Sequence, residues 1–120
     1  MRIEIIPRLW IVDRKPTKVS ITHYDAIHRR NLESQTPSFF LQTLKEITTT
    51  ILQITKNQLK DFTIIDNNIH QTSMGYVVAI AFLVRYGHFT VQQAHVQVQT
   101  KTPPFILTSV QRSCLENLKK

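Results

Sequence analysis

The stretch Tyr76–Tyr86, YVVAIAFLVRY, decides the predicted fold because it is a long apolar run between the only two glycines, Gly75 and Gly87. Seven of its eleven residues are β-branched or aromatic, a composition typical of strands. With a period of two, both faces are apolar apart from Arg85, which predicts a strand covered on both sides. A buried helix is the alternative, because a continuous apolar run fits either element, and we favour the strand. The run is too short to cross a bilayer as a helix, which needs roughly 20 apolar residues.

The segment that follows Gly87 predicts one more strand and then a helix. Apolar residues alternate with polar ones over 88–98, but their phase changes at Gln92–Gln93, as it does at a β-bulge. Thr102–Pro104 ends this strand and opens a C-terminal helix. The expected apolar stripe of that helix consists of Leu107, Val110, Cys114 and Leu118.

The segment that precedes the apolar run predicts a long helix and a short strand. From Pro37 to about Lys60, apolar residues recur with a period of 3.6 and occupy one side of a helix. Thr36 can cap this helix, and Pro37 suits its first position. Residues 62–65 read as a strand that ends at the turn residues 66–68.

The N-terminal part predicts a hairpin. Residues 2–12 read as an edge strand, or as a strand with a bulge at Pro7, because proline cannot donate to a ladder. A turn at Asp13–Pro16 separates this strand from a second one at 18–23. Residues 25–36 have no regular period and form the longest connection, a kind of segment that often carries function.

These elements predict an α+β fold with the order β-β-α-β-β-β-α in a single domain, residues 1–120. The sheet is expected to be antiparallel, with one long helix and one C-terminal helix packed on one face. Charges at positions 2, 4 and 8 interrupt any apolar signal core, so we expect a cytoplasmic protein that does not enter a membrane. A single cysteine, Cys114, excludes an internal disulfide and is expected to pack in the core.

The charge balance favours anionic partners. Lys and Arg number 15 against eight Asp and Glu, a formal net charge of +7. Basic residues gather in the first two connections, and we predict polyanion binding there by Arg14, Lys15, Lys18, His28, Arg29 and Arg30. Their spread along the chain suggests contacts to a phosphate backbone rather than readout of bases. A merely solvated basic surface is an equal alternative.

Few patterns of catalysis or cofactor binding occur in the sequence. Two glycines cannot supply a glycine-rich phosphate loop, so neither a dinucleotide nor a P-loop site is expected, and we predict no cofactor. The five histidines have no metal-ligand spacing on a predicted helix, and no metal site is expected. The best acid–base cluster is His23, Tyr24 and Asp25 at a strand end, a weak candidate because such triplets arise by chance.

The leading interpretation is a small non-enzymatic module that binds nucleic acid or another polyanion through backbone-type contacts. One alternative is a homo-oligomeric assembly or interaction subunit that associates through the edge strand 2–12. A further alternative is a small-molecule enzyme or ligand binder whose pocket lies between helix and sheet and uses His23, Tyr24 and Asp25.

Overall fold

Four strands form one mixed sheet in the computed structural model, which describes residues 2–14, 17–18, 21–25, 36–66, 74–102 and 104–118. β1 pairs antiparallel with β2, whereas β2 and β3 both pair parallel with β4, which lies between them. The prediction of an antiparallel sheet is therefore right for the first pair and wrong for the other two. A long helix separates β3 from β4, and such a crossover is what parallel neighbours require. The strands are β1 (Arg2–Ile6), β2 (Leu9–Val12), β3 (His23–Asp25) and β4 (Phe62–Ile65), in the spatial order β1-β2-β4-β3.

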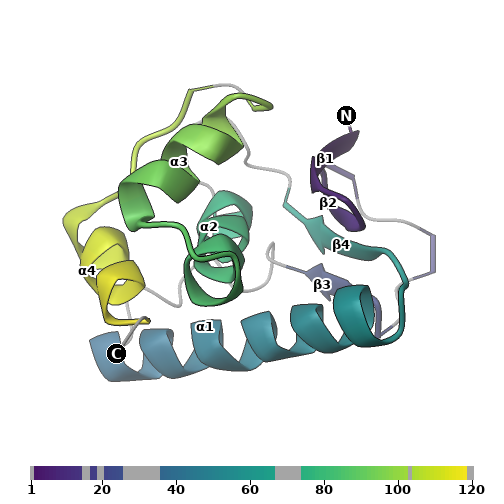
Figure 1. The fold of residues 1–120 in the computed structure, drawn as a ribbon, viewed down its shortest axis with the longest axis horizontal. Helices are drawn as coiled ribbons and strands as arrows, with labels where there is room; N and C mark the ends of the chain where they lie inside the picture. Colours follow the sequence, from purple (N-terminus) through teal and green to yellow (C-terminus); the bar gives the residue numbers. More distant parts are fainter. Residues whose placement is uncertain are drawn as a thin grey trace.

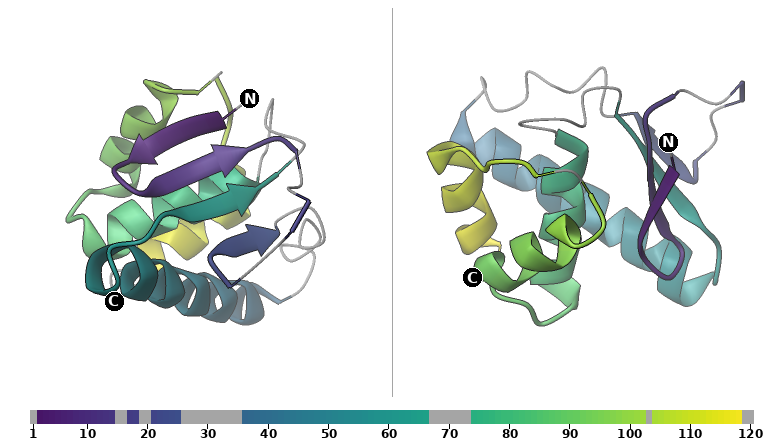
Figure 2. Two further views of the ribbon diagram at one scale, coloured as in Figure 1. Left: turned by 90° about the vertical axis from the view of Figure 1, so that its right-hand side faces the viewer. Right: turned by 90° about the horizontal axis from the view of Figure 1, so that it is seen from above.

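The helices lie on one side of this sheet, as Figures 1 and 2 show. In the described part of the chain the order is β-β-β-α-β-α-α-α, so the α+β class is confirmed and the predicted order is only partly right. Helix α2 lies in the middle and packs against the other three α-helices. The helices are α1 (Pro37–Leu52), which continues as the π-helical turn η2 (Gln53–Asn57), α2 (Met74–Tyr86), α3 (Val91–Gln99) and α4 (Ser109–Asn117).

The run predicted as the central strand, 76–86, is helix α2, so the strand prediction is wrong and the helical alternative is correct. Every residue from Met74 to Val84 is buried. A helix enclosed on all sides needs no polar face, and its sequence therefore lacks the 3.6-residue period that identifies a surface helix. The preference of β-branched residues for strands is weaker than the packing that holds this helix in the core.

The segment predicted as a bulged strand, 88–98, contains helix α3, so this prediction is also wrong. The apparent phase change reflects helical spacing, because Val91, Ala94 and Val98 are the buried residues of the helix. The sequence does carry the start signal of this helix. Thr90 caps it, and Gln93 bonds back to the backbone N–H of Thr90 at 3.0 Å, which completes a capping box.

The N-terminal hairpin is shorter than predicted and lies within residues 2–12. Pro7 and Arg8 form its turn, and Arg8 adopts a positive φ of 75°. A bulge in β1 between Glu4 and Ile6 lies just before the proline. The predicted second strand, 18–23, is wrong: the strand there is His23–Asp25, and Ile21 is 81% exposed in a turn.

Three predicted elements are confirmed. Strand β4 has the predicted bounds, α1 with η2 covers 37–57, and α4 lies in the predicted C-terminal helix. In α1, the hydroxyl groups of Thr48 (2.7 Å) and Thr49 (2.9 Å) donate to carbonyl oxygens one turn earlier, which satisfies polar groups in a β-branched segment. The predicted stripe of α4 is rotated: Val110 is 42% exposed, and Gln111 and Leu115 are buried in its place.

The core lies between the sheet and the helices and around α2. Its strand residues include Ile5, Ile11 and Ile64, which share the inner face of the sheet. No helix within the described residues combines the length and the apolar character that crossing a membrane requires.

Candidate functional site

The carboxyl ends of β2, β3 and β4 lie at one edge of the sheet, because β2 and β3 both run parallel to β4. In the last row of the sheet, Val12 pairs with Ile65 on one side and Asp25 pairs with it on the other. The two connections that carry the predicted basic residues start directly after Val12 and Asp25. The strand ends from which both connections leave, Val12 and Asp25, therefore lie at the same edge, which we call the carboxyl edge.

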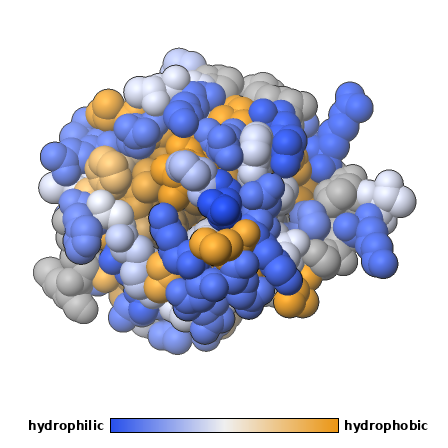
Figure 3. All heavy atoms as spheres, turned by 45° about the vertical axis from the view of Figure 1, so that its right-hand side comes forward, coloured by the Kyte–Doolittle hydropathy of each residue, from blue (hydrophilic) through white to orange (hydrophobic). Residues whose placement is uncertain are grey.

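Two of the predicted polyanion-binding residues lie in the described part of the connection that leaves this edge. Arg14 and Lys18 are both exposed. Figure 3 shows that hydrophilic residues cover most of the visible face, with smaller apolar areas between them. Four further predicted residues lie outside the described residues, and their role stays a prediction: Lys15, His28, Arg29 and Arg30.

The outer face of the sheet, away from the helices, carries one row of side chains from all four strands. Strand register places Glu4, Trp10, Thr63 and His23 in this row. The guanidinium of Arg2 lies 3.7 Å from the centre of the Trp10 ring, a cation–π contact. The Glu4 carboxylate accepts a weak hydrogen bond from the Arg8 backbone N–H at 3.4 Å. The row thus contains a half-buried aromatic ring with a cation stacked over it.

Adjacent residues of a strand point to opposite faces, so the predicted acid–base cluster is divided between the two sides of the sheet. His23 belongs to the outer row, whereas Tyr24 faces α1. Asp25 ends β3, and its side chain lies outside the described part of the structure. The described geometry therefore does not bring His23 and Tyr24 together.

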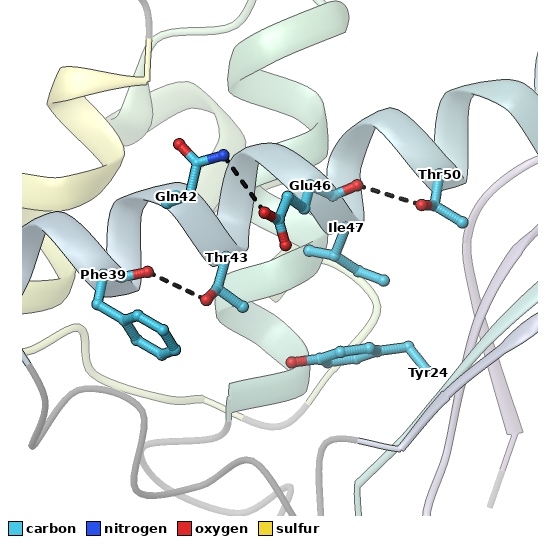
Figure 4. Close-up of a pocket in the computed structure, with 7 residues that line it drawn as sticks. All are labelled: Tyr24, Phe39, Gln42, Thr43, Glu46, Ile47 and Thr50. Atoms are coloured by element: carbon cyan, nitrogen blue, oxygen red, sulfur yellow. Dashed lines mark hydrogen bonds between the residues drawn. The ribbon is translucent and has the colours of Figure 1, made fainter.

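Tyr24 lines a groove between β3 and α1 with a volume of about 260 Å³ (Figure 4). Its ring and that of Phe39, which is 51% exposed, flank the groove. The Glu46 carboxylate accepts a hydrogen bond from Gln42 at 3.3 Å on the same wall. The groove can hold a small polar molecule against aromatic rings, and its charged lining residue is an acid, so it does not suit a polyanion.

The start of α2 carries a buried carboxylate with a structural role. Asp66 follows β4, is 0% exposed and accepts a hydrogen bond from the Gly75 backbone N–H at 2.8 Å. A negative charge at a helix N-terminus is stabilising. A side chain at Gly75 would place its Cβ 3.1 Å from the Asp66 Cβ, so glycine permits this close approach.

Tyr76 should make the protein less stable above about pH 10. Burial raises the pKa of Tyr76 to about 12; the nearby Asp66 charge acts in the same direction, and Thr102 opposes it. An unfolded tyrosine ionises near pH 10. Between these values the unfolded state binds fewer protons than the folded state, so the free energy of unfolding falls as pH rises, by up to about 1.4 kcal/mol per pH unit.

Below pH 10 the contribution of the protonated Tyr76 side chain to the free energy of unfolding is fully present. Urea unfolding between pH 9 and 11 should therefore show a steeper loss of stability in the wild type than in Tyr76→Phe. Equal pH slopes would contradict a buried, neutral Tyr76.

Histidine and cysteine residues in the described part of the chain form no reactive cluster. His95 in α3 lies 3.3 Å from the Phe105 carbonyl oxygen and 3.0 Å from the Gln99 amide. Cys114 is 4% exposed in α4, as expected for core packing. Within the described residues, no group of three His, Cys, Asp or Glu side chains could hold a metal ion.

Comparison with protein-family models, with curated proteins and with solved structures gives no match to this chain. The geometry of the described residues is therefore the basis on which a function can be proposed.

Proposed function

We propose that this protein binds nucleic acid or another polyanion at the carboxyl edge of its sheet. The observation that supports the proposal is the parallel pairing of β2 and β3 with β4, because it starts both basic connections at one edge. In open sheets with parallel strands, ligands commonly bind beyond the carboxyl ends of the strands. A formal net charge of +7 favours anions over other ligands.

Two kinds of contact would act together. Arg14 and Lys18 are exposed cations that can contact phosphates in any sequence. On the adjoining outer face, the planar guanidinium of Arg2, which is stacked over Trp10, offers a surface for an unpaired base. This combination predicts weak, sequence-tolerant binding that prefers single strands.

Reversing the two described cations should weaken this binding. We expect the double variant Arg14→Glu/Lys18→Glu to bind a labelled single-stranded oligonucleotide at least about tenfold more weakly at low salt. Each lost phosphate contact should also reduce the slope of log affinity against log salt by about 0.7. Fluorescence anisotropy at two salt concentrations measures both quantities. The emission of Trp10, the only tryptophan, reports independently on the outer face.

The matched control is Lys56→Glu/Lys60→Glu, which changes the net charge by the same amount. Both lysines are exposed and come before β4, so they lie toward the opposite edge of the sheet. This control should retain wild-type affinity, and both double variants should keep the wild-type melting temperature. Equal weakening of oligonucleotide binding in both variants would show that the affinity depends on net charge and not on the carboxyl edge. No binding at low salt would reject the proposal.

Rejection would favour one of the two alternatives. β1 is an edge strand, and sheet extension through it would appear as a dimer in sedimentation. The groove at Tyr24 would instead bind a small molecule and protect Tyr24 and Phe39 from solvent.

A further inference from the structure

Arg85, near the end of α2, contacts α1 through neutral groups. Its Nη1 donates to the carbonyl oxygen of Lys45 and to the hydroxyl oxygens of Thr48 (3.0 Å) and Thr49 (2.9 Å). Among the residues that the structure describes, no carboxylate lies at ion-pair distance from this guanidinium. The guanidinium also lies 5.0 Å from the centre of the Tyr86 ring, a cation–π contact, so its described partners are all uncharged and its positive charge is retained.

The remaining donors of Arg85 are available to a ligand. Nε and Nη2 have no hydrogen-bond acceptor among the described residues, and neither is a buried, unpaired atom. Together they form the planar edge that matches two oxygens of a phosphate. The three contacts of Nη1 hold the guanidinium in place, so little conformational freedom is lost when an anion binds.

A shallow, open groove of about 440 Å³, lined by polar and charged residue types, lies beside this guanidinium. Lys45 is a second basic residue in its lining. Glu46 is the acid in its lining, and the carboxylate of Glu46 accepts a hydrogen bond from Gln42 at 3.3 Å. Two cations against one carboxylate leave the groove positive. Its lining consists of Gln42, Lys45, Glu46, Thr49, Thr50 and Arg85.

We propose that Arg85 and Lys45 form a binding site for a phosphate group. Arg85 binds two phosphate oxygens through Nε and Nη2, and the Lys45 ammonium balances the remaining charge. The site lies between α1 and α2 and uses none of the residues of the carboxyl edge. It therefore goes beyond the proposed function and does not depend on it.

Inorganic phosphate is the first probe, titrated into ¹⁵N-labelled protein at an ionic strength held constant with chloride. We expect a saturable shift of the Arg85 Nε–H signal. Arg85→Lys, which lacks the planar pair of N–H donors, should weaken the affinity for phosphate by about tenfold or more. Lys45→Gln should weaken it by about fivefold, and Glu46→Gln should strengthen it by about threefold, as expected for single charges near a protein surface.

The matched control is Lys56→Gln, an exposed lysine of η2 that does not line the groove. It should leave phosphate affinity unchanged, as should Arg14→Glu/Lys18→Glu. If Arg85→Lys fails to fold, the opposite effects of Lys45→Gln and Glu46→Gln still test the site. No saturable shift, or equal weakening by Lys45→Gln and Lys56→Gln, would overturn the proposal.

Two further probes identify the source of the phosphate. Tighter binding of phenyl phosphate than of inorganic phosphate, with no competition from an oligonucleotide, supports a small phosphorylated ligand. Displacement of phosphate by a single-stranded oligonucleotide supports the backbone of a nucleic acid. Failure of both phenyl phosphate and the oligonucleotide to compete with inorganic phosphate would identify free inorganic phosphate as the ligand of this site.

Discussion

Phe82→Ala should lower the free energy of unfolding by about 3–5 kcal/mol. Phe82 lies in α2, is 2% exposed and packs with its ring centre 5.7 Å from that of Tyr86. Truncation removes the transfer free energy of the ring and leaves a cavity in a helix that is enclosed by the sheet and the other helices. The midpoint of urea unfolding, at an unchanged slope, measures this loss.

Phe39→Ala is the matched control, because it makes the same change at a side chain that is 51% exposed. It should lower the free energy of unfolding by less than about 1 kcal/mol. Similar losses for the two variants would mean that Phe82 is not enclosed or that a partner covers Phe39.

Asp66→Ala should lower the free energy of unfolding by about 2–3 kcal/mol, since it removes a charged acceptor from a buried N–H group. The Asp66 carboxylate accepts a hydrogen bond from Gly75 at 2.8 Å at the start of α2. Without it, the Gly75 N–H stays buried with one acceptor fewer, and the positive end of the helix dipole loses its anion. Chemical denaturation at pH 7 measures the change.

Asp66→Asn separates the loss of the hydrogen bond from the loss of the charge, because an amide oxygen can accept the same hydrogen bond without carrying a charge. We expect this variant to lower the free energy of unfolding by about 1 kcal/mol, the usual contribution of a charge at a helix terminus. Asp61→Ala, at an exposed aspartate before β4, should leave the free energy of unfolding nearly unchanged. An equal loss for Asp66→Ala and Asp61→Ala would show that Asp66 does not support α2.

The sequence predicts those elements whose signals are local. Strand β4 ends at a turn cluster and α1 has a clear apolar face, and both were predicted within a few residues of their bounds. Helix α2 has no such face because it is buried all round, so its period is uninformative. The capping box at Thr90 was a sufficient sign of α3, but the alternation of apolar residues masked it.

Strand order could not be predicted, because no local signal says which strand lies between which others. The parallel pairing that brings two basic connections to one edge is a property of the topology alone. Tyr24 was predicted as part of a pocket between helix and sheet, and it lines such a groove. Arg85 is not among the predicted site residues, although it is the only charge in the apolar run 76–86 and a charge in such a run is a usable signal for the phosphate site that we propose.

The position of β4 between β2 and β3 has a consequence for the timing of synthesis. Strands β2 and β3 both lack their parallel neighbour, β4, until Ile65 has been added to the chain. At about 5–20 residues per second, the ribosome takes roughly 3–10 s to extend the chain from Val12 to Ile65. During that interval the native pairing available to β2 is with β1, and the side of β2 that later binds β4 stays open to chaperones or to other chains, as does that of β3 once Asp25 has been added.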